Sequence, residues 1–358
     1  MSIPKYFIFF VLSLFQSFTF VLIGNSILEI KGMLWPYWLI LFSASFFSNL
    51  LGLNVSNNMK TVVAIYILIP LLLVPQMLLG GAMVKFDKLN NRISTQKYVP
   101  VIGDIITARW AYEALMVYQF RYNKYQAELF EPEQNESHAA FYIDYLIPEV
   151  QTLADQCLIY RNDPGKKLRY SSFLLKIRTQ LEKISSSENL PLFEAFEKLN
   201  EMSYSEQVHA SLQNYLIKVT RYFSKELNSA SLEKDQKLED MASKIGGKDA
   251  LILLHQQYYN NAVADIVMNK NDRDNLVYYK NEIIRKKEPV YQLPAARNGR
   301  AHFFAPEKKL GRYYLNTFWF NVMAIWMMNL VLYLFLQRGM VKIAGSAIKS
   351  FAAFKKNN

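Results

Sequence analysis

The sequence is poor in cysteine, and four of its segments lack charge altogether. Among 358 residues there is one cysteine, Cys157, which excludes an intramolecular disulfide and any metal site built from several cysteines. Segments 6–28, 34–53, 61–84 and 313–336 contain no Asp, Glu, Lys or Arg. Most of the charge lies in 85–312. This distribution excludes a purely soluble protein, a disordered chain and a compact bundle that lies wholly within a membrane.

Signatures of catalysis and of metal binding are also missing. The four histidines are widely separated and form neither an HxxxH nor an HExxH pattern; they are His138, His209, His255 and His302. No serine lies in a GxSxG motif. The net charge is +11, but tyrosines and lysines are spread along a nearly balanced middle region, so we expect no nucleic-acid binding. We expect no catalytic residues and no metal site.

The four uncharged segments predict transmembrane helices. A bilayer core of about 30 Å takes roughly 20 apolar helical residues, and each segment reaches that length. A charged side chain at mid-bilayer costs about 3 kcal/mol on insertion scales, so charge is kept out of such spans. The first segment is too long for the apolar region of a signal peptide and is expected to be a retained span.

Basic residues predict the orientation of these spans. One set of short flanks carries only basic residues, whereas the opposite loop carries one of each sign, Glu29 and Lys31. The basic flank residues are Lys5, Lys60, Arg338, Lys342, Lys349, Lys355 and Lys356. The positive-inside rule therefore predicts cytoplasmic termini and an extracytoplasmic region 85–312 in a multi-pass membrane protein. The basic tail, 337–358, is expected to form an amphipathic helix on the cytoplasmic leaflet.

The large middle region predicts helices. Apolar residues recur at helical spacing from Tyr170 to Ile184 and from Leu212 to Phe223, and a third helix is predicted around Leu251–Ala262. Turn signals separate the helices; they are Glu131-Pro132, Asn162–Gly165, Ser185–Ser187 and Gly246-Gly247. Alternating β-branched runs are absent. We therefore expect an all-α fold, a polytopic membrane protein with four transmembrane helices and a large inserted helical extracytoplasmic domain.

The third uncharged segment has features that suit a transport path. Pro70 and Pro75 lie five residues apart, and the pair Gly80-Gly81 lies near the predicted exit. Proline kinks a helix, and glycine lets another helix or a solute come close. The exit sequence Phe86–Leu89 and the aromatic segment Arg109–Leu115 follow.

This order of parts resembles the C-terminal part of ABC-2 type permeases, and most of all the ABCG-like exporters of bacteria. The resemblance covers about 1–120 and 313–340. It implies six spans in each of two paired permease halves and an ATP-binding cassette. Here four spans are visible, and neither G-x-x-x-x-G-K-[ST] nor Leu-Ser-Gly-Gly-Gln occurs, since Asp249 follows Gly247-Lys248. ATP and Mg are therefore expected on a partner cassette or on a missing N-terminal region, not on this chain.

The resemblance also implies site residues. The family's gate falls on Ala82 and Met83, directly after Gly80 and Gly81, and Gln76 is the polar side chain expected to face the path. A second set matches the re-entrant aromatic helix of the outer vestibule; it consists of Arg109, Trp110, Tyr112 and Glu113. Each of these residues has an alternative interpretation as helix packing or as an interfacial anchor.

The expected organisation follows from these parts. Residues 1–84 hold three spans, 85–120 the exit loop and the aromatic helix, 121–312 the extracytoplasmic domain, 313–336 the last span and 337–358 the tail. The predicted function, as the resemblance implies, is the permease portion of an ATP-driven exporter in a bacterial inner membrane. It is expected to work with a cassette and a second permease half in the lipid bilayer. One alternative is a membrane-anchored protein whose outer helical domain binds a partner. An envelope enzyme is disfavoured because no catalytic spacing is present.

Overall fold

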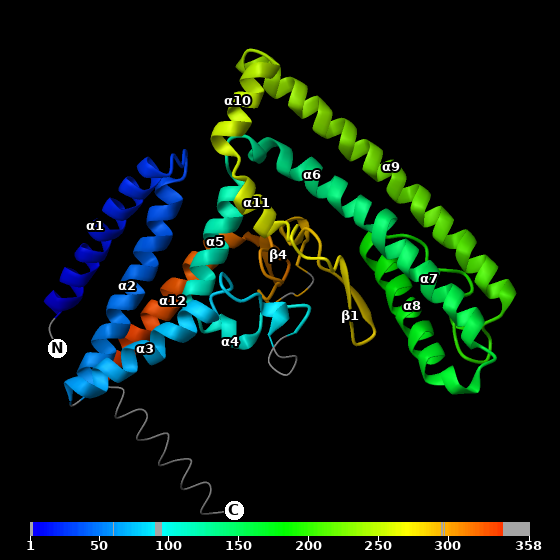
Figure 1. Cartoon of the computed structure of the whole chain (residues 1–358), viewed down its shortest axis with the longest axis horizontal. Coiled ribbons are helices and arrows are strands. Elements are labelled where there is room, and N and C mark those ends of the chain that lie inside the picture. The colour runs from blue at the N-terminus through cyan, green and yellow to red at the C-terminus, as the bar shows by residue number, and fades with distance from the viewer. Residues whose placement is uncertain (1–2, 60, 90–94, 295, 297, 339–358) are drawn as a thin grey trace, which may run out of the picture. The chain divides into compact units, whose positions relative to one another are not determined.

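The computed structural model describes residues 3–59, 61–89, 95–294, 296 and 298–338 (Figure 1). Most of them are helical. The chain divides into two compact units. The first comprises Met1–Lys124, Gln257–Asn260 and Leu293–Asn358, and the second comprises Tyr125–Gln256 and Asn261–Gln292.

Three helices of the first unit are long and apolar enough to cross a membrane. They are α1 (Ile3–Ile27), α2 (Leu34–Asn58) and α12 (Thr317–Arg338). They correspond to the predicted segments 6–28, 34–53 and 313–336. The last segment differs at its start, because residues 313–316 form a strand that pairs with the strand before it. The chain is thus a mostly helical protein with three candidate membrane spans among the described residues.

The third predicted span is shorter than expected. Helix α3 covers Val62–Leu78, 17 residues with Pro70 and Pro75 inside it. At 1.5 Å per residue it is about 26 Å long. Residues 79–84 form turns and bends instead of helix, with Gly81 at φ +86°. A continuous helix over 61–84 is therefore wrong, and a fourth complete span stays a prediction.

Polar side chains join α2 to α12. The indole of Trp326 donates to the Ser43 hydroxyl (3.0 Å), and the Asn54 amide donates to the carbonyl of Leu332 (3.0 Å). Asn329 donates to the carbonyl of Ser43 (3.3 Å). Such bonds hold helices together in lipid, where the hydrophobic effect gives little drive for helix association. The two helices run in the same direction, because residue 43 contacts 326 and 329 whereas residue 54 contacts 332.

The second unit has its own helical core. Its helices are α6 (Gln126–Phe141), α7 (Ile147–Tyr160), α8 (Lys167–Glu188), α9 (Glu206–Ile245), α10 (Lys248–Tyr258, whose last two residues belong to the first unit) and α11 (Asn261–Val267). A π-helical turn, Tyr142–Leu146, joins α6 to α7. The Tyr142 ring stacks on Phe223 of α9 with centroids 3.9 Å apart. The periodic residues of α8 and α9 are buried in this core, which confirms both predicted helices.

Two of the four predicted turns are wrong. The sequences Asn162–Gly165 and Gly246-Gly247 do separate helices, as predicted. Pro132 instead lies inside α6, although proline removes a helical hydrogen bond. Pro132 is buried together with Leu129 and Phe130, so helix packing outweighs the local cost. Ser185–Ser187 belong to the last turns of α8, and their hydroxyls donate to main-chain carbonyl oxygens.

The fold is not all-α, because it contains two short antiparallel hairpins. Strands β1 (Leu276–Tyr279) and β2 (Glu282–Arg285) pair in the second unit. Strands β3 (Glu307–Leu310) and β4 (Tyr313–Asn316) pair in the first unit. Each two-residue turn begins at a positive φ, +56° at Lys280 and +62° at Gly311. Four-residue strands are too short to produce an alternating pattern. The predicted amphipathic tail lies outside the described residues from 339 onward.

Candidate functional site

The candidate site is built around α5 (Thr107–Arg121), which packs against α12 in the opposite direction. The ring of Tyr118 lies 4.6 Å from that of Phe318, near the start of α12. At the other end of α5, the Thr107 hydroxyl approaches the sulfur of Met328 at 3.7 Å, near the middle of α12. Helix α5 therefore lies beside the first half of a candidate span.

Gln76 of α3 contacts the first turn of α5. The backbone N–H of Ala108 donates to the Gln76 side-chain oxygen at 3.2 Å. The first N–H groups of a helix have no partner within the helix, so this amide caps α5 from another element. A Cβ added at Gly80 would lie 3.5 Å from the Cβ of Ala108. The structure thus brings Gln76 and Gly80 together with the start of the aromatic helix.

Gly81 and the two predicted gate residues have different surroundings. At φ +86°, a Cβ on Gly81 would lie 2.5 Å from the Phe303 ring and 2.9 Å from Phe86. Ala82 and Met83 are exposed, Met83 with 65% of its surface accessible. The predicted gate is therefore a surface of this chain at the end of α3, and it is not packed inside the first unit.

Glu113 of α5 is the centre of a buried charge cluster. Its carboxylate accepts hydrogen bonds from Lys308 Nζ (2.6 Å) and from the Asn321 amide (3.0 Å). The Arg109 guanidinium lies 3.4 Å away on the preceding turn of α5. Lys308 comes from β3 and Asn321 from α12. The cluster therefore joins the aromatic helix to a candidate span, α12, and to strand β3, whose Lys308 lies 195 residues after Glu113 in the sequence.

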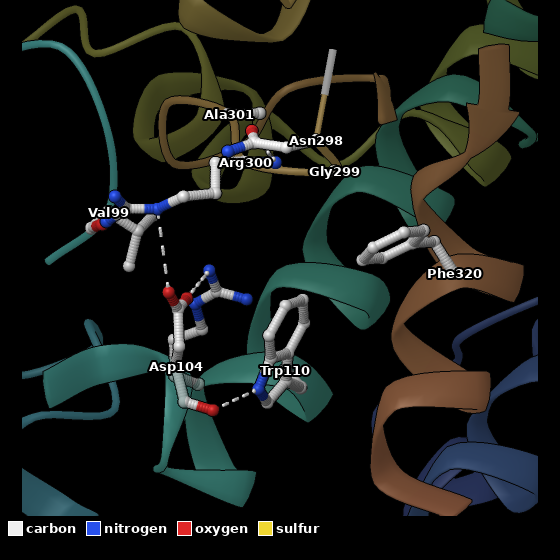
Figure 2. A pocket seen from close by; sticks show the side chains of 9 residues that line it. Val99, Asp104, Trp110, Asn298, Gly299, Arg300, Ala301 and Phe320 are labelled. Carbon is white, nitrogen blue, oxygen red and sulfur yellow. Dashed lines mark hydrogen bonds and ion pairs between the residues drawn. The ribbon is translucent and has the colours of Figure 1, made fainter. Parts of the chain in front are cut away.

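Arg109 extends the cluster towards Asp104, which ends the short helix α4 (Val101–Asp104). Its guanidinium donates to the Asp104 carboxylate at 2.8 Å and lies 3.6 Å above the Trp110 ring. The Trp110 indole donates to the main-chain oxygen of Asp104 at 2.9 Å. Arg300 lies on the other side of Asp104, with Nε 3.8 Å from the carboxylate (Figure 2).

Burial and the neighbouring opposite charges shift the pKa values of these groups in opposite directions. Burial of Glu113 favours its neutral form, but the charges of Lys308 and Arg109 and the hydrogen bonds from Lys308 and Asn321 outweigh it, so the pKa of Glu113 is lowered. For Asp104, burial raises the pKa by more than the charges of the nearby arginines lower it, so its pKa is raised. Burial lowers the pKa of Lys308 and of Arg109. We conclude that Glu113 is a carboxylate held between two cations.

Asp104, Arg109 and Arg300 line a cavity of about 210 Å³. Its other walls are Val99, Trp110, Asn298, Gly299, Ala301 and Phe320. In Figure 2, Phe320 extends from α12 towards Trp110. The Asp104 carboxylate pairs with both guanidinium groups, at 2.8 Å from Arg109 and 3.8 Å from Arg300. The cavity therefore combines two cations and one anion with aromatic walls.

Of the four residues predicted on the aromatic helix, the structure places three in this cluster. Arg109, Trp110 and Glu113 are buried in it. Tyr112 instead faces Phe303 and Phe304, with ring centroids 6.2 and 5.9 Å away, and burial raises its pKa.

Sequence reasoning missed the partners of these residues. They are Asp104, Arg300, Lys308 and Asn321. Lys308 stands in the polar sequence Glu307–Leu310, which resembles a solvated surface segment. Of these partners, only Asn321 could have been noticed in the sequence, because it is a polar residue within an apolar segment.

The sequence Gly246-Gly247-Lys248 does not fit a nucleotide-binding loop. Both glycines have positive φ, +101° and +110°, and form the corner between α9 and α10. A P-loop instead joins a strand to a helix and presents several backbone N–H groups to phosphates. This corner therefore differs from a P-loop in the element that precedes it, which is a helix and not a strand.

Comparison with known proteins identifies the first third of the chain. Residues 1–120 match the model of the ABC-2 type transporter family. The match covers α1, α2, α3 and all but the last residue of α5. It supports the resemblance to an ABC-2 type permease. Together with the apolar helices, the match supports a multi-pass membrane protein. No curated protein and no solved structure matches the chain.

Proposed function

We propose that this chain is the permease portion of an ATP-driven, ABCG-like exporter in a bacterial inner membrane. Its termini lie in the cytoplasm and residues 85–312 lie outside. The family match supports a transporter of the ABC-2 type. The observation that carries the proposal is the bond between Gln76 and the N–H of Ala108, because it places the end of α3 directly against the start of the aromatic helix.

The two sides of that contact differ in how firmly they are held. Helix α5 is tied to α12 and to β3 through Glu113. Helix α3 has no buried residue along Val62–Leu78 and contacts few other elements. We therefore expect residues 79–84 to move together with α3, whereas α5 stays in place against α12. In this mechanism Ala82 and Met83 meet the same residues of a second permease half and exclude water until the halves separate.

ATP binding and hydrolysis belong to a cassette on a separate chain or elsewhere in a longer polypeptide. This chain supplies no enzyme activity, catalytic residue or cofactor site of its own. Its residues provide the membrane path and the outer helix that borders it.

Cysteine cross-linking tests the gate without knowledge of the substrate. A disulfide requires Cα atoms within about 7 Å, so Met83→Cys is expected to cross-link two copies in native membranes under mild oxidation. Met202→Cys is the control, because Met202 is 97% exposed but lies in the second unit. Cys157 is buried and does not compete. Absence of a dimer with Met83→Cys, or an equal yield from both variants, would contradict the gate.

One observation favours a second candidate, a membrane-anchored interaction protein. The second unit has a complete core and lies outside the matched residues. If this candidate is correct, residues 125–292 on an unrelated membrane anchor retain the function. If the permease proposal is correct, that chimera is inactive.

A further inference from the structure

The cavity beside Trp110 is partly open, and more positive than negative charge surrounds it. Three cations, Arg109, Arg300 and Lys308, face two carboxylates, Asp104 and Glu113. Lys308 and Glu113 are fully buried, so they act on the cavity through their field and do not reach a ligand. A group with one negative charge would balance the cluster.

Hydrogen-bond donors remain for such a group. A guanidinium has five N–H donors. Among the described residues, Arg300 donates to the carbonyl of Val99 at 2.8 Å and lies only loosely against Asp104, at 3.8 Å. The Nε of Arg109 is buried and has no hydrogen-bond partner in the described chain. An unmatched donor on a buried arginine is costly, and Arg109 lines the cavity.

The walls and the position of the cavity narrow the choice of anion. Gly299 has φ +78°, and a Cβ there would lie 2.8 Å from the Phe320 ring, so glycine keeps the aromatic wall in place. Phe320 is the fourth residue of α12. The end of a candidate span lies at the level of the lipid headgroups, where phosphate is the abundant anion. Arginine pairs well with phosphate because its fork matches the oxygen geometry.

We propose that this cavity binds a phosphate ester group that carries one negative charge, as in the headgroup of an anionic phospholipid. Arg300 donates to the phosphate oxygens and Arg109 supplies its unmatched N–H. Trp110 and Phe320 pack against the carbon atoms next to the phosphate. Asp104 positions both arginines and limits their affinity for anions. This assignment does not depend on ATP coupling or on the gate.

Lipid titration followed by native mass spectrometry tests the proposal on the full chain in detergent. Phosphatidylglycerol is compared with phosphatidylcholine, and free glycerol phosphate is added as a competitor. We expect Arg300→Gln to weaken phosphatidylglycerol binding about tenfold or more, the loss typical of one charge-assisted hydrogen bond. The control is Arg312→Gln, which makes the same charge change at an exposed turn outside the cavity and leaves binding unchanged.

Asp104→Asn is an independent test, because this variant is expected to raise the affinity for phosphatidylglycerol, whereas Arg300→Gln lowers it. Removal of this carboxylate makes the cavity more positive, so phosphatidylglycerol binds several times more tightly even though Arg109 loses a partner. A purely structural role for Asp104 predicts weaker binding or none. Displacement of the lipid by free glycerol phosphate identifies a soluble phosphate ester as the natural ligand, whereas no displacement identifies the lipid. Equal effects of Arg300→Gln and Arg312→Gln, or weaker binding by Asp104→Asn, overturn the proposal.

Discussion

Lys308 and Glu113 form an ion pair in which neither side chain is accessible to solvent. Their Nζ and Oε1 atoms lie 2.6 Å apart, and the pair joins β3 to α5. A buried ion pair is weak evidence for stability, since both charges have lost their hydration. Removal of one partner alone is costly because the other charge stays buried.

We expect Glu113→Gln to destabilise the protein by about 3–5 kcal/mol, the usual cost of breaking a buried pair. The double variant Glu113→Gln with Lys308→Met recovers much of that loss, since no uncompensated lysine remains. Thermal unfolding in detergent measures both effects. The control is Glu307→Gln, whose partner Arg121 is partly exposed, and which costs about 1 kcal/mol or less. A double variant no more stable than the single one would show that the pair is not coupled.

Gly81 has a backbone conformation and a neighbourhood that only glycine suits. In Gly81→Ala the new methyl group meets Phe303 and Phe86 at a positive φ, so we expect a loss of about 1–3 kcal/mol, measured by thermal unfolding. Gly52→Ala in α2 is the matched control, because nothing lies within 4 Å of the added atom. It is expected to be neutral or slightly stabilising. Equal behaviour of the two variants would contradict the close packing at Gly81.

Cys157 is expected to be chemically inert in the folded protein. It is fully buried, and burial raises the pKa of its thiol to about 12. The thiolate is the reactive form, so maleimide labelling stays negligible at pH 7 and at pH 9 until a denaturant is added. The folded state keeps the thiol protonated, and the protein therefore loses stability as pH rises from 9, where the unfolded thiol ionises, towards 12. Rapid labelling without denaturant would contradict this burial.

The inert native thiol makes the predicted orientation testable. Ser229 on α9 and Ser56 on α2 are both exposed. A membrane-impermeant maleimide added to intact spheroplasts is expected to label Ser229→Cys, and to label Ser56→Cys only after permeabilisation. The reverse pattern would place region 85–312 in the cytoplasm and contradict the proposed exporter topology.

The membrane helices and the main helices of the second unit could be predicted because local signals determine them. Absence of charge predicts α1, α2 and α12, and helical periodicity predicts α8 and α9. The end of α3 could not be predicted, since residues 79–84 are as apolar as the helix before them and differ in backbone conformation. The hairpins were missed because strands of four residues carry almost no periodic signal.

The partners in the candidate site depend on tertiary structure. Glu113 and Arg109 were identified on the aromatic helix, but the burial of Lys308 depends on the β3–β4 hairpin lying against α5. Asp104 and Arg300 are far apart in the sequence. Two loops bring them together, because the backbone N–H of Val99 in one loop donates to the carbonyl of Ala301 in the other at 3.1 Å. Charge in a polar segment gives no sign of such burial.

The central claim is that this chain is the permease of an ATP-driven transporter, and photolabelling of the native complex tests it most directly. The complex is purified through this chain in mild detergent and exposed to azido-ATP with Mg and vanadate. We predict a labelled polypeptide with a P-loop, either on a separate chain or outside this sequence in a longer one, together with ATP hydrolysis. An intact complex that contains no nucleotide-binding polypeptide and hydrolyses no ATP would contradict the account.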